Sequence, residues 1–258
     1  MKMQTDRPVA RSIAWALAGT LCLSGCAGGS ATGSDKPPSG GASALPQGSD
    51  EVTLDPADFT VDVTNKYWPM KKGDRWLYEE RDENGTVTRD EVTVLDQTEE
   101  INGIESLVVH DLATQDGVPI EDTTDWYAQD SAGNLWYLGE KTTEYENGQP
   151  SSTEGSWQYG VDGAQAGIIL PAEPTPGLQY RQEYLKGEAE DKAIVLSTDE
   201  QAQTPTGLYH DSLLTRDTTP LEPELVELKW YAPGVGPVLT LTPSGEQTRE
   251  QLVEAPGG

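Results

Sequence analysis

Two histidines, many carboxylates and many aromatic side chains are the residues of this chain that could carry chemistry. His210, Asp211 and Ser212 are of the types found in a catalytic triad, but they are consecutive. Neighbours in an extended strand point to opposite faces, so these three cannot form a hydrogen-bonded relay. His110 lies among apolar residues, and the two histidines lack the spacing of metal ligands. The sequence therefore predicts no catalytic residue, no metal site and no cofactor.

Acidic residues outnumber basic ones, with 44 Asp+Glu against 17 Lys+Arg and a formal net charge of −27. This excess excludes nucleic acid as a partner, because phosphate binding needs a basic footprint. Acidic pairs such as Asp82-Glu83, Asp90-Glu91 and Glu121-Asp122 lie in turns or in mostly polar runs. We interpret them as a solvated surface that keeps the protein soluble. A pair of carboxylates can hydrolyse a glycosidic bond, but no pair stands out for that role.

Aromatic residues are the most suggestive candidates for binding, with seven Trp and ten Tyr in the chain. Such side chains are favoured in antiparallel strands, and they also dominate ligand-binding surfaces because each joins an apolar ring to a polar tip. Core packing is the favoured interpretation for any one of them, and a ligand-facing role is the alternative. The candidate ligand-binding residues are Trp126, Tyr127, Trp136 and Trp230.

The elements that must position these residues are strands. Short apolar or alternating runs are separated by turn pairs such as Asn84-Gly85, Asp116-Gly117 and Asn147-Gly148, which mark hairpins. The pattern predicts strands over 74–81, 86–95, 104–113, 121–129, 135–145, 151–158, 179–186, 189–198, 208–218, 225–232, 237–242 and 246–253. Some of these runs are apolar on both faces, so the sheet must be covered on both sides. We expect an all-β antiparallel meander, strongly curved or barrel-like.

An internal repeat with an offset of 104 residues relates two parts of this body. Gly73 matches Gly177, Gly103 matches Gly207, and Trp126-Tyr127-Ala128 matches Trp230-Tyr231-Ala232. These are residue types that backbone geometry and packing constrain. The sequence therefore predicts two similar halves, about 66–160 and 170–254. The tryptophans should occupy matching strand positions and be the buried members of the tripeptides.

The N-terminus has the features of an export signal. Lys2, Arg7 and Arg11 precede an apolar run over 12–23 that is too short to span a membrane. It ends in Leu23-Ser24-Gly25-Cys26, which resembles a bacterial lipobox. The resemblance implies that 1–25 is a lipoprotein signal peptide. It also implies that Cys26 carries lipid and anchors the chain to the outer face of a membrane in the cell envelope.

A Gly-, Ser- and Pro-rich segment follows Cys26. Its composition cannot bury enough apolar surface to offset the entropy of ordering it. We therefore expect a lipidated cysteine and flexible stalk over 26–64 and a single all-β body over 65–258.

The body resembles uncharacterised exported β-rich bacterial proteins. The resemblance is carried by the stretch from Trp230 to Val238, by the stretch from Thr204 to Tyr209, and by the opening residues Pro69, Gly73 and Trp76. It implies a β-sheet fold and assigns no functional residue.

Three functions fit these observations. The first is a non-enzymatic, lipid-anchored envelope protein that binds a small ligand or an envelope partner. The second is a carrier of an apolar molecule in a curved-sheet cavity. The third is a carboxylate-dependent glycan hydrolase. An internal apolar pocket would favour the carrier, and a Trp-lined groove with two facing carboxylates would favour the hydrolase.

Overall fold

The chain folds into an antiparallel sheet of sixteen strands, described by a computed structural model for residues 45–245 and 247–257. The first half contains η1 (Pro56–Asp58), β1 (Phe59–Thr60), β2 (Arg75–Asp82), β3 (Val87–Ile101), β4 (Ile104–Gln115), β5 (Val118–Asp130), β6 (Leu135–Glu146), β7 (Gln149–Ser152), β8 (Trp157–Gln158) and β9 (Gln165–Leu170). The second half contains β10 (Gln179–Arg181), β11 (Glu183–Tyr184), β12 (Lys192–Thr204), β13 (Gly207–Thr218), β14 (Val226–Ala232), β15 (Gly236–Thr242) and β16 (Thr248–Glu254). The predicted all-β, antiparallel fold is confirmed. No helix in the described ranges is long and apolar enough to cross a membrane.

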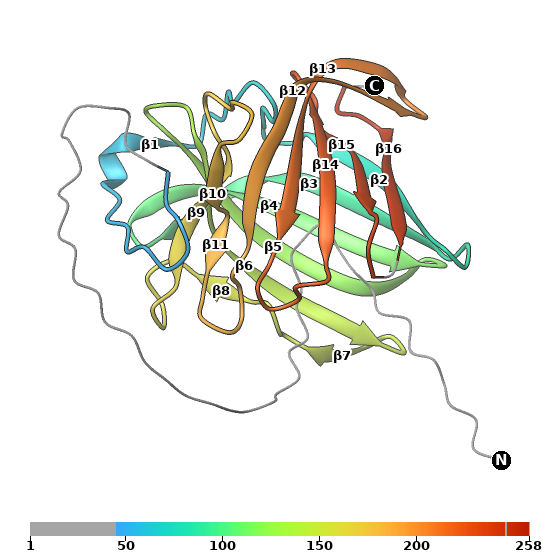
Figure 1. The fold of residues 1–258 in the computed structure, drawn as a ribbon. Coiled ribbons are helices and arrows are strands. Elements are labelled where there is room, and N and C mark those ends of the chain that lie inside the picture. The colour runs from blue at the N-terminus through green and yellow to red at the C-terminus, as the bar shows by residue number, and fades with distance from the viewer. Residues whose placement is uncertain (1–44, 246, 258) are drawn as a thin grey trace, which may run out of the picture.

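The sheet curves into a nearly closed barrel (Figure 1). The two halves meet where β16 pairs with β2. At the opposite side, one short segment joins the remaining edges. Its first part, β10, pairs with β12, and its second part, β11, pairs with β9, with Gln182 between them. We call the segment 179–184 the seam, because it links the last strand of the first half to the second half.

Gly167 on β9 allows the seam to approach closely. A Cβ atom at this position would lie 2.2 Å from the Gln182 carbonyl oxygen and 2.7 Å from that of Arg181. Those contacts are with backbone atoms, which cannot move aside as a flexible side chain can. A residue without a side chain is therefore required at the point where the barrel closes.

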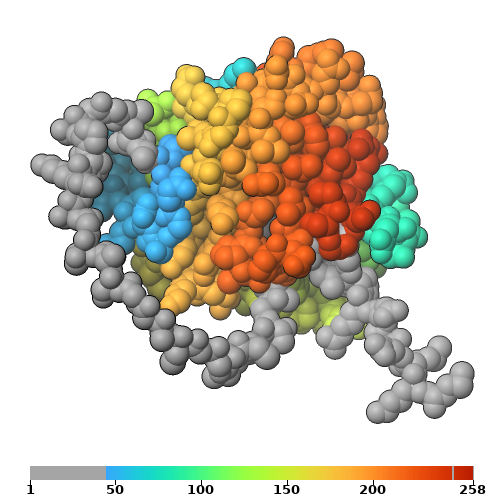
Figure 2. Space-filling view, in the orientation of Figure 1, coloured from blue at the N-terminus to red at the C-terminus, as the bar shows by residue number. Residues whose placement is uncertain are grey.

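The N-terminal strap, residues 45–54, lies against the seam (Figures 1 and 2). Arg181 holds it: the backbone N–H donates to the Pro46 carbonyl at 2.8 Å, and Nη1 donates to the carbonyls of Gly48 and Asp50 at 2.8 and 2.6 Å. A little further on, β1 pairs with β5. The predicted stalk over 26–64 is therefore too long, because 45–64 lies on the barrel. Residues 26–44 and Cys26 lie outside the described residues.

The composition of the strap did not reveal this packing, because the contacts use backbone carbonyls. Any residue type supplies a carbonyl, and here the partner is an arginine far along the sequence. The partly buried Leu45, Val52 and Leu54 add apolar contacts with the core.

The two halves repeat the same strand pairings. Gly73 and Gly177 both have positive φ, 87° and 90°, and each N–H donates at 2.8 Å to a valine carbonyl, Val94 or Val195. In β5, Trp126 pairs with Val108 of β4, and in β14, Trp230 pairs with Leu214 of β13. A register shift follows each tryptophan on its other side. The two Trp-Tyr-Ala tripeptides occupy matching positions, as the sequence predicts.

The prediction that the tryptophans are the buried members of these tripeptides holds for Trp126 and is wrong for Trp230, and both tyrosines are buried as well. Tyr127 and Tyr231 are 5 % and 3 % exposed, Trp126 is 6 % exposed, and Trp230 is only half-buried. The tyrosines lie near buried carboxylates, Asp125 and Asp217. A phenol suits that environment better than an indole of the same burial, because its hydroxyl can both donate and accept hydrogen bonds.

Candidate functional site: the barrel interior

Buried carboxylates surround the interior of the barrel. All but Asp191, which directly precedes β12, lie in strands of the two halves, and each is at most 6 % exposed. We call them the acid ring: Asp90, Asp111, Glu121, Asp125, Glu140, Glu183, Asp191, Asp217 and Glu250. The charge of each carboxyl group raises the pKa of a neighbouring one. This series of neighbours runs from Glu250 through Asp90 and Asp111 to Asp125 and Glu140. The series continues through Glu183 and Asp191 to Asp217.

Burial is the largest cause of the raised pKa values in the acid ring, because the charged form of a carboxyl loses its hydration. It raises the pKa of Asp125 to about 7, of Asp191 to about 8 and of Asp217 to about 6. For Asp111 the pKa is raised well above its ordinary value, by burial and then by the charge of Asp90. Part of the acid ring is therefore protonated at neutral pH.

Lys229 is the buried lysine that faces the acid ring in the described part of the chain. Its Nζ lies 3.7 Å from Asp217 Oδ2 and 3.1 Å from Glu227 Oε2. Burial lowers the pKa of Lys229, but these two carboxylates raise it by more, so the side chain stays charged. The other buried cation of the described residues, Arg181, binds the N-terminal strap and Ala166 O instead.

Tyrosines form the layer next to the acid ring. The rings of Tyr127 and Tyr137 stack with centroids 4.9 Å apart, and Tyr137 Oη donates to Asp125 Oδ1 at 2.5 Å. Tyr78 Oη donates to the Pro237 carbonyl at 3.0 Å. Burial raises the pKa of these phenols well above their ordinary value, so they remain neutral donors.

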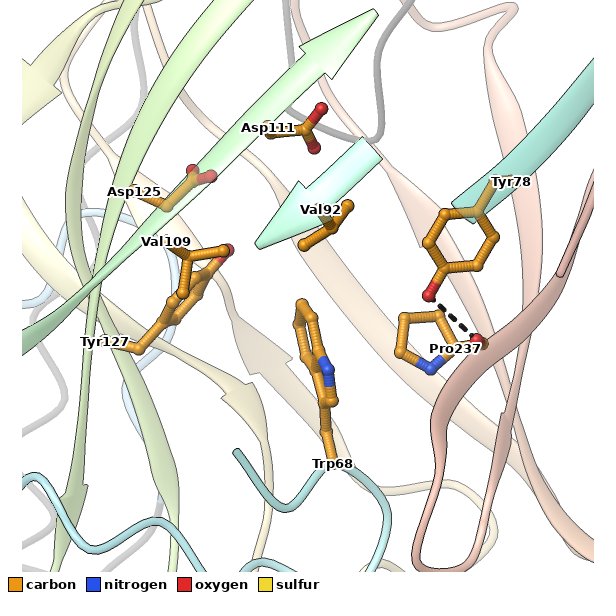
Figure 3. A pocket seen from close by; sticks show the side chains of 8 residues that line it. All are labelled: Trp68, Tyr78, Val92, Val109, Asp111, Asp125, Tyr127 and Pro237. Carbon is orange, nitrogen blue, oxygen red and sulfur yellow. Dashed lines mark hydrogen bonds between the residues drawn. The ribbon is translucent and has the colours of Figure 1, made fainter. Parts of the chain in front are cut away.

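A small cavity lies where the tyrosine layer meets the acid ring (Figure 3). Its walls are Trp68, Tyr78, Val92, Val109, Asp111, Asp125, Tyr127 and Pro237. The space open to the centre of a water molecule is about 10 Å³, which is room for roughly one water. Figure 3 shows the Asp111 and Asp125 carboxyl groups side by side above the ring of Trp68. The cavity is too small for an apolar cargo molecule.

The structure does not bring the four predicted ligand-binding residues together. Trp126 Nε1 donates to Glu99 at 3.0 Å, and Trp136 Nε1 donates to Asp130 at 2.8 Å. Trp136 also packs edge-on against Phe59. Of the four, Tyr127 lines the cavity.

Replacing Trp126 with Ala should destabilise the protein by about 3 kcal/mol, and replacing Trp230 by about 1–2 kcal/mol. The reason is that Trp126 is buried and hydrogen-bonded, whereas Trp230 is half-buried and its Nε1 has no partner among the described residues. Urea denaturation of the two variants would measure the difference. Equal losses would contradict this reading of the tripeptides.

The acid ring is not evident from the sequence. The prediction that the pairs containing Asp90 and Glu121 lie on a solvated surface is wrong, because these two residues are 2 % and 1 % exposed. Over 87–94 of β3 the buried residues are Thr88, Asp90, Val92 and Val94, so every second residue is buried. The sequence alone does not identify this buried face, because two of its residues are polar and polar residues of a strand ordinarily face solvent.

The histidines show no assembled active site. His110 Nε2 lies 3.1 Å from Asp122 Oδ1, and both side chains are more than one-third exposed. His210 and Asp211 are exposed while Ser212 is buried, so these three are not together. Within the described ranges, no group of three His, Cys, Asp or Glu residues is placed to hold a metal ion.

Comparison with known proteins gave two structural likenesses. One is a predicted exported protein with a YmcC-like fold from Bacteroides fragilis, with 17% identity, a TM-score of 0.43, and coverage of 74% of this chain and 99% of that chain. The other is a predicted lipoprotein from Parabacteroides distasonis, with 15% identity, a TM-score of 0.41, and coverage of 74% and 98%. At these TM-scores neither likeness bears on function. No protein-family model and no curated protein matches the chain.

Proposed function

We propose that this chain is a lipid-anchored protein of the cell envelope that binds a ligand in its barrel interior and catalyses no reaction. The observation that carries the proposal is the acid ring with its layer of tyrosines. The lipobox-like residues ending at Cys26 supply the proposed location and anchor.

The acid ring supports a binding function because burying these carboxyl groups destabilises the folded state. Burying a carboxyl group without a full set of hydrogen bonds costs free energy, and burying its charge costs more. One oxygen each of Glu140, Glu183, Asp191 and Asp217 has no hydrogen-bond partner among the described residues. Apolar residues of similar size would fill the same space at no such cost. Groups that destabilise a fold in this way are typical of functional sites.

A carrier of an apolar molecule is the weaker alternative. Its cavity would need apolar walls and room for the cargo. The cavity of Figure 3 has room for roughly one water and includes two carboxyl groups in its wall.

Native mass spectrometry of the full chain, purified from its own membrane in mild detergent, would test the proposal. We expect a bound small molecule that is released when the acid ring is altered, as in Asp111→Asn. The exposed control Glu146→Gln should keep it. A spectrum without a bound molecule would contradict binding in the interior.

The anchor is tested separately by Cys26→Ala. This variant should lose its partitioning into the detergent phase or accumulate as precursor, because the sulfur that accepts the lipid is gone. Its barrel should keep its melting temperature, since the described fold begins at Leu45. Phase partitioning with Triton X-114, alongside wild type, measures the change. Unchanged partitioning would contradict a lipid on Cys26.

A further inference from the structure

The internal repeat places two pairs of side chains at matching positions of the barrel interior. On β4 and β13, Leu107 and Leu213 pair with the tyrosines of the two tripeptides, Tyr127 and Tyr231. Counting four residues on from these leucines gives Asp111 and Asp217. Counting two residues back from the tyrosines gives Asp125 and Lys229. Asp111 thus corresponds to Asp217, and Asp125 corresponds to Lys229.

In the second half, one of the two matching positions holds an ammonium group, that of Lys229. Lys229 Nζ lies 3.7 Å from Asp217 Oδ2 and 3.1 Å from Glu227 Oε2, and its side chain is 4 % exposed. The fold therefore accommodates a buried ammonium beside the β13 carboxylate. Its charge also offsets part of the effect that burial has on Asp217, whose pKa is about 6.

In the first half, the ammonium is replaced by a second acid. Asp111 and Asp125 line the cavity of Figure 3, and among its eight lining residues none is a cation. Asp111 is 4 % exposed, and its Oδ1 has no hydrogen-bond partner among the described residues. Trp68 Nε1 is likewise buried and without a partner there. The cavity has room for roughly one water, which is also the size of an ammonium group.

We propose that this cavity binds the ammonium group of a primary amine, held between the carboxyl groups of Asp111 and Asp125 beside Tyr78, Tyr127 and Trp68. The bound group would stand where the second half has its own lysine ammonium. The inference rests on the proposed function, ligand binding in the barrel interior, and names the class of ligand.

The chemistry of the walls selects such a ligand. The Asp125 carboxylate balances the charge of an ammonium, the oxygens of both carboxyl groups accept its N–H donors, and neighbouring aromatic rings favour a cation over a neutral group. A divalent metal would need three or more ligands at short distances, and the described residues form no such group. A quaternary ammonium has no N–H donor to give to the two carboxyl groups.

Thermal unfolding of the full chain at pH 8 provides the test, because Asp125, with a pKa of about 7, is mostly ionised there. The probes are methylammonium, sodium, potassium and tetramethylammonium chlorides at equal concentration. We expect methylammonium to raise Tm by about 3–6 °C over sodium at a concentration several times its Kd. Potassium and tetramethylammonium should match sodium. No rise in methylammonium, or an equal rise in potassium or tetramethylammonium, would overturn the proposal.

Two variants locate the site. Asp125→Asn removes one of the two carboxyl groups, and Asp125→Lys places an ammonium in the first half, as Lys229 does in the second. Both should lose the rise in methylammonium, while the exposed control Glu146→Gln keeps it. A rise that persists in Asp125→Asn overturns the assignment. If the variants do not fold, calorimetric titration of wild type with methylammonium replaces them, and the absence of saturable heat overturns the proposal.

The outcomes separate this inference from the proposed function. No effect of methylammonium, together with a bound molecule in the native mass spectrum, overturns the amine site alone. No effect, together with a spectrum that shows no bound molecule, overturns both.

Discussion

Raising the pH from about 5 to 8.5 should lower the melting temperature of this protein by about 10 °C or more. The cause is the acid ring, whose members have raised pKa values in the folded state, about 7 for Asp125, about 8 for Asp191 and about 6 for Asp217. In the unfolded chain these groups titrate near 4. Each unit of difference is worth about 1.4 kcal/mol, and 1 kcal/mol shifts Tm by about 2–4 °C in a protein of this size.

The sign follows from proton binding. Between pH 4 and 8 the folded state holds more protons than the unfolded state, so stability falls as pH rises. The contribution of the acid ring is fully present below the unfolded pKa and is lost as pH passes through the folded values. Below about pH 4, Glu91 opposes this trend, because Arg75 holds its pKa below the ordinary value. We therefore expect maximum stability near pH 4–5.

Differential scanning calorimetry at constant ionic strength between pH 4.5 and 8.5 measures this dependence. The double variant Asp191→Asn and Asp217→Asn should show a shallower slope, because two of the titrating groups are removed. The exposed control Glu146→Gln should follow wild type. Stability that rises with pH over this range would contradict the burial of the acid ring.

Gly167→Ala should destabilise the barrel by about 5 kcal/mol or prevent it from folding. The new methyl group would lie 2.2 Å from the Gln182 carbonyl oxygen and 2.3 Å from its carbon. Relief would require β9 to separate from the seam, which would break the β9–β11 pairing. Because the seam links two edges of the sheet, its loss would open the barrel.

Gly163→Ala is the control for this prediction. An added Cβ there meets no atom within 4 Å, so the cost comes only from its positive φ of 86° and should be about 1 kcal/mol. Urea denaturation measures both variants, and soluble yield with near-UV circular dichroism applies if Gly167→Ala does not fold. Similar losses for the two would contradict a closed seam.

The strands and their repeat could be predicted because both depend on local sequence patterns. Turn glycines with positive φ, such as Gly73 and Gly177, and alternating runs mark β2 to β6 and β12 to β16, although the predictions for β3 and β12 end six residues too early. The strand β9 was missed, because Ala166 to Leu170 is buried throughout and has no alternation. The predicted strand over 151–158 is two short strands, β7 and β8, which pair with different parts of β6.

The acid ring and the cavity could not be predicted in the same way. They depend on closure of the sheet, which decides the inner face, and closure depends on contacts between distant residues such as Gly167 and Gln182. One signal was available in the sequence. The repeat places Lys229 where the first half has Asp125. Opposite charges at matching positions of a repeat indicate that the two side chains face the same environment.

The N-terminal strap gives the barrel a defined point of mechanical load. A pull transmitted along the chain from residue 44 reaches the carbonyls of Pro46, Gly48 and Asp50 first, and all three are held by Arg181. Arg181 belongs to β10, within the segment that links the two edges of the sheet. Tension on the leading segment would therefore be borne by the joint of the barrel, ahead of the long hairpins on the far side of the sheet.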